Sequence, residues 1–185
     1  VFIKNKNHLR LSITGTLLIL GSLQSYAANS CTLVNNIYEC TGSGNTTYQN
    51  SVSTPSVTYH LDSTYNTTSS FAVSNYTGKI AFTQDYGSIL AGGSMYLEAA
   101  GEDGDVSAII AGKIEGTVVG IEAINSYNSI NGSININQMS GSISGTGAGI
   151  FAGNYSIMPG TINIDVSGVI TVGAFGGIYI ESRNL

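Results

Sequence analysis

The chain has 185 residues, with 24 Gly, 11 Tyr, no Trp, two Pro and two Cys, and only 9% of its residues are charged. So few charges and prolines argue against a disordered chain, and a formal net charge of −5 argues against a nucleic-acid partner. The abundance of Gly, Ser, Thr, Asn, Ile, Val and Tyr is typical of strands and turns, and it predicts an all-β protein.

Residues 1–27 have the features of a secretory signal peptide. A basic start is followed by an apolar run from Leu11 to Leu23, and small residues precede a cleavage site between Ala27 and Ala28. The alternative is a transmembrane helix, but the run is shorter than the roughly 20 apolar residues that cross a bilayer. We therefore expect cleavage after Ala27 and export of the remaining chain, which would be more acidic than its precursor.

Cys31 and Cys40 both lie in the part expected to be exported. In an oxidising compartment such a pair most simply forms a disulfide, which here would hold the start of the folded chain. A redox or metal role is the alternative, but this spacing matches no common metal motif and His60 would be the one histidine left after cleavage. We expect a structural disulfide, no metal and no cofactor.

The organisation of the chain changes at about residue 78. Residues 28–77 are rich in Thr, Ser, Asn and Tyr with short apolar patterns, and they predict an irregular, capping β region. Residues 78–185 contain a repeat with copies that start at Gly112, Gly141 and Gly168, about 28 residues apart. The matching segments are Gly112-Lys113-Ile114, Gly141-Ser142-Ile143 and Gly168-Val169-Ile170, then Gly120-Ile121, Gly149-Ile150 and Gly177-Ile178, then Gly132-Ser133-Ile134-Asn135-Ile136 and Gly160-Thr161-Ile162-Asn163-Ile164.

Each copy predicts three short strands separated by Gly or Asn turns. The alternation in Ile134-Asn135-Ile136 gives each strand one apolar and one polar face. Three strands per copy, with isoleucine at matching positions, predict copies that stack at the strand spacing as a parallel β-helix. An antiparallel β-sandwich is the alternative, but sandwiches do not usually repeat one sequence unit at this interval.

A degenerate copy is expected between Gly78 and Gly112, since Gly78-Lys79-Ile80 resembles the start of the next copy. Its extra residues predict a projecting loop, for which Ala99 to Asp105 is the acidic and Gly-punctuated candidate. Residues 101–105 are either a solvated turn or a calcium site, although they match neither the EF-hand nor the calcium-binding nonapeptide.

The signal peptide and the repeated Gly-x-Ile, Gly-Ile and Gly-x-Ile-x-Ile segments resemble the passenger region of a bacterial type V autotransporter, most clearly from Ser140 to Ser182. The resemblance implies a right-handed parallel β-helix that a C-terminal β-barrel carries across the outer membrane for display or release. It also implies adhesion or virulence through an unknown surface receptor, protein or glycan. Since this chain has no room for such a barrel, we expect an N-terminal fragment, exported to the periplasm if the chain is complete.

A catalytic role is the alternative, as a β-helical enzyme that degrades polysaccharides. The acids Glu115, Glu122 and Asp165 are scattered in the sequence, and paired carboxylates would need a defined separation. His60 and Asp62 could serve a serine nucleophile, but no nucleophile motif accompanies them. We therefore expect no catalytic residues.

Basic and aromatic residues give little further indication of a ligand. Lys79, Lys113 and Arg183 would be the cations of the exported chain, a poor provision for an anionic polysaccharide. Tyr127, Tyr155 and Tyr179 occur once per copy and form an approximate stripe, which packing explains as well as sugar binding does.

Overall fold

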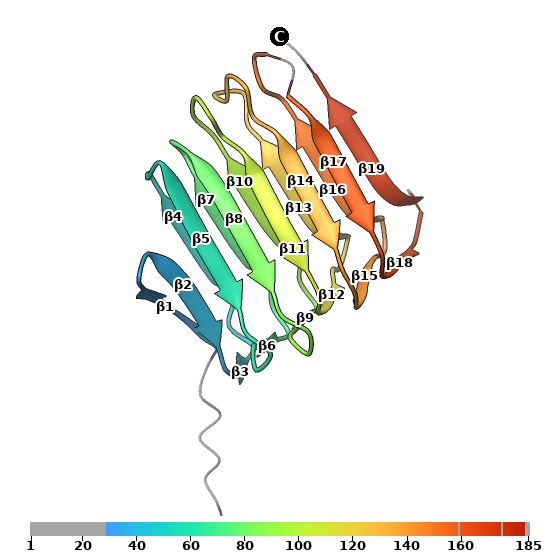
Figure 1. Cartoon of the computed structure of the whole chain (residues 1–185). Helices are drawn as coiled ribbons and strands as arrows, with labels where there is room; N and C mark the ends of the chain where they lie inside the picture. Colours follow the sequence, from blue (N-terminus) through green and yellow to red (C-terminus); the bar gives the residue numbers. More distant parts are fainter. Residues whose placement is uncertain (1–28, 159, 175, 184–185) are drawn as a thin grey trace, which may run out of the picture.

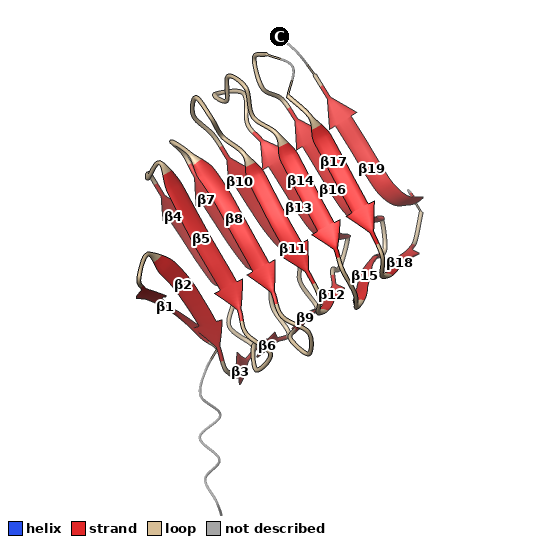
Figure 2. Cartoon of the chain, in the orientation of Figure 1, coloured by secondary structure: helices blue, strands red, loops and turns tan. Residues whose placement is uncertain are grey.

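The described residues fold as a parallel β-helix in which every regular element is a strand (Figures 1 and 2). This computed structural model describes residues 29–158, 160–174 and 176–183. The expected signal peptide, with its cleavage site between Ala27 and Ala28, lies outside the described residues. In those residues, no helix is long and apolar enough to span a membrane.

Successive strands go to three sheets in turn, so that each turn of the chain adds one strand to every sheet. In spatial order sheet A contains β1 (Ser30–Val34), β2 (Ile37–Thr41), β5 (Ser56–Leu61), β8 (Lys79–Gln84), β11 (Val106–Ile110), β14 (Ile134–Gln138) and β17 (Ile162–Val166). Sheet B contains β3 (Ser43–Gly44), β6 (Asn66–Thr67), β9 (Ile89–Ala91), β12 (Lys113–Glu115), β15 (Ser142–Gly145) and β18 (Val169–Val172). Sheet C contains β4 (Tyr48–Val52), β7 (Phe71–Asn75), β10 (Met95–Ala99), β13 (Val119–Asn125), β16 (Ala148–Asn154) and β19 (Gly176–Ser182).

Three consecutive strands, one from each sheet, make what we call a rung, from β2–β3–β4 to β17–β18–β19. The predicted repeat is confirmed, because equivalent isoleucines lie opposite one another on adjacent rungs: Ile134 and Ile162, Ile143 and Ile170, Ile150 and Ile178. Alternate residues of each strand point into the space between the sheets, where they form one continuous apolar core.

The equivalence expected between Gly78 and Gly112 is wrong. Ile80 lies on sheet A opposite Val106, whereas Lys113 lies on sheet B opposite Ile89. The same three residues, Gly-Lys-Ile, occur in both places because each segment starts a strand. In each, a turn glycine precedes the strand and the isoleucine points inward. Residues 99–105 are therefore not an insertion: Ala99 ends β10, and the following residues form the ordinary corner that leads to β11.

The irregular N-terminal portion is shorter than expected. From β2 onward the strands join the three sheets in parallel, so residues 37–75 already contribute two rungs. The rungs lengthen along the chain: the contact between Glu39 and His60 on adjacent rungs spans 21 residues, that between Ser74 and Glu98 spans 24, and that between Asn135 and Asn163 spans 28. Because the early rungs differ in length, the sequence there has no fixed period, and no repeat can be recognised in it.

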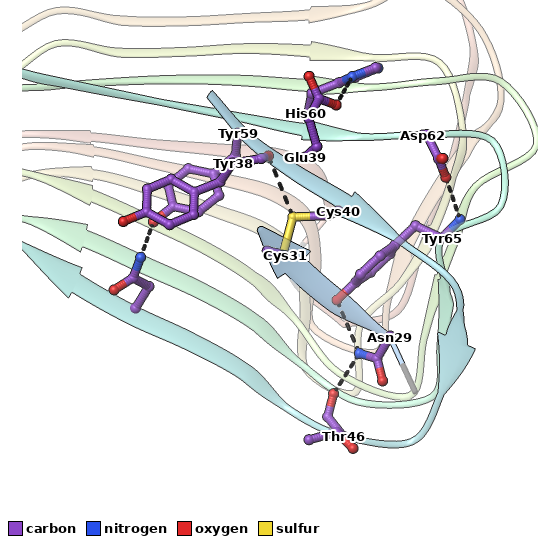
Figure 3. Close-up of a disulfide and its surroundings, with 11 residues drawn as sticks. Asn29, Cys31, Tyr38, Glu39, Cys40, Thr46, Tyr59, His60, Asp62 and Tyr65 are labelled. Atoms are coloured by element: carbon purple, nitrogen blue, oxygen red, sulfur yellow. Dashed lines mark hydrogen bonds and ion pairs between the residues drawn. A yellow bond between two sulfur atoms is a disulfide. The ribbon is translucent and has the colours of Figure 1, made fainter. Parts of the chain in front are cut away.

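The irregular part is the antiparallel hairpin β1–β2 at one end of the solenoid (Figure 1). Its turn places Asn35 and Asn36 at positive φ, which Asn tolerates better than most residues. Cys31 lies opposite Cys40 and is joined to it as a disulfide, next to the stacked rings of Tyr38 and Tyr59 (Figure 3). We call this disulfide-bonded hairpin the N-terminal cap.

The inward assignment of Ile150 can be tested against an outward neighbour on the same rung. Ile150 is fully buried, whereas Ser142 on β15 is only half-buried. Ile150→Asp should lower the free energy of unfolding by about 3 kcal/mol or more, because it buries an unpaired carboxylate, while Ser142→Asp should change it little. Denaturant melts of both variants measure the difference, and equal losses would contradict the assignment.

Candidate functional site

Three groups of outward side chains have the chemistry of a functional site. The first is Tyr96, Glu98 and Glu122 on the outer surface of sheet C. The second is a set of exposed and half-buried aromatic rings at the later rungs of that sheet. The third is His60 between two carboxylates beside the N-terminal cap.

Tyr96, Glu98 and Glu122 come together because inward Met95, Leu97 and Ala123 force their neighbours outward. Tyr96 lies opposite Glu122 on the next rung. The Tyr96 hydroxyl donates a hydrogen bond to Oε2 of Glu98 over 3.0 Å, and Ser74 donates to the same oxygen over 3.2 Å. Oε2 of Glu98 therefore accepts two hydrogen bonds, one from its own strand and one from the preceding rung.

Burial raises the pKa of Glu122 above the ordinary value for a carboxyl group, and the nearby charge of Glu98 raises it further. Burial, followed by the charge and hydrogen bond of Glu98, also raises the pKa of Tyr96. A carboxylate beside a carboxyl group that holds its proton more firmly is an arrangement found where one acid donates a proton and the other stays charged.

These rings lie in two stacked pairs on the later rungs, and each pair has one exposed and one half-buried ring. Tyr127 stacks on Tyr155 with ring centroids 5.1 Å apart, and Phe151 stacks on Tyr179 at 5.5 Å. Tyr127 is 49% exposed and Tyr179 46% exposed. The predicted stripe of one Tyr per copy is therefore divided, because Tyr179 pairs with a phenylalanine and not with Tyr155.

A shallow apolar depression of about 280 Å³ adjoins the second pair. Its lining includes Phe151, Tyr179 and Val118, and Val118 is 59% exposed. We call Val118, Tyr127, Phe151, Tyr155 and Tyr179 together the aromatic face. A contiguous apolar surface of this kind on the outside of a protein commonly marks a contact site.

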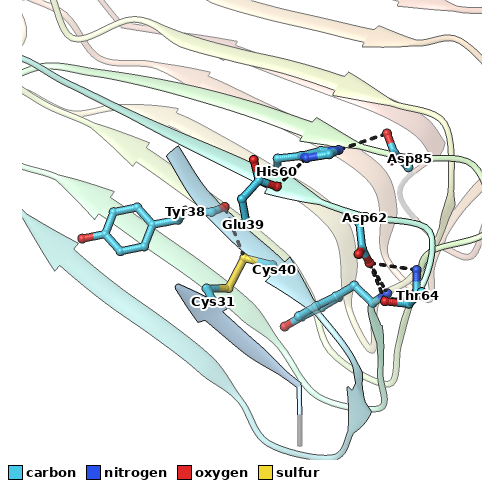
Figure 4. A network of polar contacts seen from close by, with 9 residues as sticks. Cys31, Tyr38, Glu39, Cys40, His60, Asp62, Thr64 and Asp85 are labelled. Atoms are coloured by element: carbon cyan, nitrogen blue, oxygen red, sulfur yellow. Dashed lines mark hydrogen bonds and ion pairs between the residues drawn. A yellow bond between two sulfur atoms is a disulfide. The ribbon is translucent and has the colours of Figure 1, made fainter. Parts of the chain in front are cut away.

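His60 does not meet Asp62, its expected partner. Asp62 follows the end of β5 and accepts hydrogen bonds from the backbone and hydroxyl of Thr64 and from the backbone of Tyr65 (Figure 4). His60 instead contacts Glu39 and Asp85. A histidine whose two ring nitrogens both face carboxylates is unlike the base of a serine hydrolase, which leaves one nitrogen for the nucleophile.

The other acids considered from the sequence are not brought together. Glu115 lies on sheet B, Glu122 on sheet C and Asp165 on sheet A. In the described residues no three His, Cys, Asp or Glu side chains are placed to hold a metal ion. In the acidic corner 101–105, Asp105 contacts Nζ of Lys79 at 2.8 Å and accepts the backbone N–H of Ser133 at 2.9 Å.

The remaining basic residues of the described chain are also paired with acids. Nζ of Lys113 lies 2.6 Å from Glu115, and Nε of Arg183 lies 2.5 Å from Glu181. Glu181 in addition accepts a hydrogen bond of 3.0 Å from the Tyr155 hydroxyl at the border of the aromatic face. These pairs leave the aromatic face with little cationic character.

Sequence reasoning missed both the Tyr96–Glu98 pair and the two partners of His60. Tyr96 and Glu98 lie on one strand, and the partners of His60 lie one rung away from it. Both contacts belong to the early rungs, where no repeat is visible in the sequence. The indication present in the sequence was alternation: Met95, Leu97 and Ala99 are apolar, so Tyr96 and Glu98 between them had to share the outer surface.

Comparisons with protein-family models, with curated proteins and with solved structures find no match to this chain. The fold and the three outward groups are thus the observations from which function has to be inferred.

The protonation of Glu122 gives a pH-dependent prediction. Because its pKa is raised in the folded state, its charged form costs stability at neutral pH and its protonated form does not. Glu122→Gln should therefore raise the urea midpoint at about pH 7 and leave it nearly unchanged at about pH 4. Glu102→Gln, which removes an exposed acid of the corner, serves as control and should shift neither midpoint; a loss of stability in Glu122→Gln at neutral pH would contradict the assignment.

Proposed function

We propose that this chain is the display part of an exported, non-catalytic surface protein that acts in adhesion, of the kind found in autotransporter passengers. The aromatic face is its contact surface, and the receptor is a protein or glycan on another cell or host surface. The proposed location is the cell surface or the medium.

The observation that carries this proposal is the aromatic face itself. Large apolar side chains that stay exposed on a rigid sheet bring contact area without loss of backbone freedom, and aromatic residues are enriched at protein interfaces. Tyr127, Tyr155 and Tyr179 add hydroxyl groups to an otherwise apolar surface, which suits a receptor with both apolar and hydrogen-bonding groups. The regular solenoid gives these side chains a fixed spacing along the stack.

A second candidate is an enzyme that cleaves polysaccharides with Glu98 and Glu122. The paired carboxylates and the raised pKa of Glu122 favour it, because glycoside hydrolysis uses one protonated and one ionised acid. Against it, Glu98 already accepts two hydrogen bonds from Tyr96 and Ser74, which restrict its access to a substrate.

Binding measurements separate the two candidates. We expect the purified chain to bind whole cells and an immobilised panel of glycans and surface proteins saturably, without turnover of polysaccharides. Tyr179→Ala should weaken this binding by about tenfold or more, because it removes a central ring of the contact surface. Tyr86→Ala is the matched control, since Tyr86 is 76% exposed but lies in the corner between β8 and β9.

Two results would overturn the adhesion proposal. One is binding that Tyr179→Ala leaves at the level of Tyr86→Ala. The other is polysaccharide turnover by the unaltered chain that is lost in both Glu98→Gln and Glu122→Gln, which would establish the enzyme instead.

A further inference from the structure

His60 on β5 is held between carboxylates from the two neighbouring rungs (Figure 4). Its Nδ1 lies 2.7 Å from Oε2 of Glu39 on β2, and its Nε2 lies 3.2 Å from Oδ1 of Asp85, directly after β8. All three side chains are partly exposed, so protons exchange freely with solvent. One ring thus connects three successive rungs on the outside of sheet A.

This geometry requires a charged ring. An ionised carboxylate only accepts hydrogen bonds, and a neutral imidazole has a single N–H to donate. Both contacts are therefore satisfied together only when His60 carries two protons. When it loses one of them, a ring lone pair faces a carboxylate and that contact becomes repulsive.

The protonation equilibrium agrees with the geometry. Burial lowers the pKa of His60, but the hydrogen bonds and charges of Asp85 and Glu39 raise it more, so that it lies above the ordinary value for histidine. A folded-state pKa that is raised contributes stability that is fully present below the unfolded value of about 6.5 and is lost as the pH rises through the folded value.

Among the described residues near the N-terminal cap, His60 is the side chain that can supply a positive charge. Asp62, on the same strand end, is a third carboxylate nearby and is occupied by its own turn. On β8 the register neighbour of His60 is Thr83, which is uncharged. Lys79, Lys113 and Arg183 make their ion pairs with Asp105, Glu115 and Glu181. Neutral His60 would leave Glu39 and Asp85 without a cation.

What these contacts hold in place is the N-terminal cap. Glu39 is adjacent to the disulfide-bonded Cys40, and among the described strands β1 pairs with β2 alone. The cap is therefore joined to sheet A through β2, and the ion pair between Glu39 and His60 reinforces that strand pair from outside.

We propose that Glu39, His60 and Asp85 form a pH-dependent clasp that keeps the N-terminal cap closed on the solenoid in mildly acidic solution. When His60 loses its proton, the clasp releases and the first rung opens more readily, while the disulfide keeps the hairpin itself intact. The clasp weakens as the pH rises through the folded-state pKa of His60, which lies above the ordinary value of about 6.5.

Hydrogen exchange measured on the purified chain at about pH 5.5 and about pH 8.5 tests the clasp, after correction for the intrinsic pH dependence of exchange. We expect the protection of residues 30–41 to fall several-fold at the higher pH, while that of β14 and β17 stays constant. His60→Gln should show the lower protection at both pH values. Asp165→Asn, which removes an acid from the same outer surface of sheet A, should behave as the unaltered chain.

A titration of the His60 ring by NMR provides a second measurement, made first on the unaltered chain. We expect its pKa to lie above about 6.5, and to fall in both Glu39→Gln and Asp85→Asn. The spectrum of His60→Gln assigns the resonance, since the sequence contains a second histidine. The proposal is overturned if His60 titrates at or below its ordinary value, or if His60→Gln keeps the pH-dependent loss of protection at residues 30–41.

Discussion

The structure depends on the in-register parallel pairing of each rung with the next. Because a strand's neighbour presents the equivalent residue at every position, each inward side chain rests on another of the same column, as Val106, Ile134 and Ile162 do. A slip of one residue would turn such a column outward and bring its polar neighbours into the core. The core therefore fixes the register, and the register in turn decides which outward side chains meet.

This constraint explains which part of the fold could be predicted from the sequence. From Gly112 onward the inward columns repeat isoleucine, and the glycine turns recur with them; Gly141, for example, has a positive φ, and a Cβ there would collide with the carbonyl oxygen of Gly112. In the early rungs the inward column holds Tyr38, Tyr59 and Phe82. Stacked aromatic rings fill the core here as isoleucine does in the later rungs, with 4.7 Å between the centroids of Tyr38 and Tyr59. They do not match the isoleucines in residue type, so the repeat is not seen in the sequence.

The candidate sites were harder to predict, because they join residues one rung apart and the rungs differ in length. Glu39 and His60 lie 21 residues apart, Ser74 and Glu98 lie 24 apart, and no single spacing finds both. Asp62 was the natural partner for His60 by proximity in sequence. Asp62 instead accepts hydrogen bonds from backbone N–H groups of the turn that directly follows its strand. These bonds are local in sequence and do not depend on the register between rungs.

The same nearest-neighbour pairing keeps the two ends of the molecule independent. In a stack where each rung contacts only the next, loss of contacts at one end is felt strongly by the adjacent rungs and only weakly farther away. His60 lies on the second rung, and the aromatic face begins only at Val118, directly before the fourth rung's strand in sheet C. Opening of the N-terminal cap would thus change the accessibility of β1 and β2 without altering the spacing of Phe151 and Tyr179. The proposed pH-sensitive cap and the proposed contact surface are compatible in one chain, because in a solenoid the loss of contacts at one rung affects mainly the adjacent rungs.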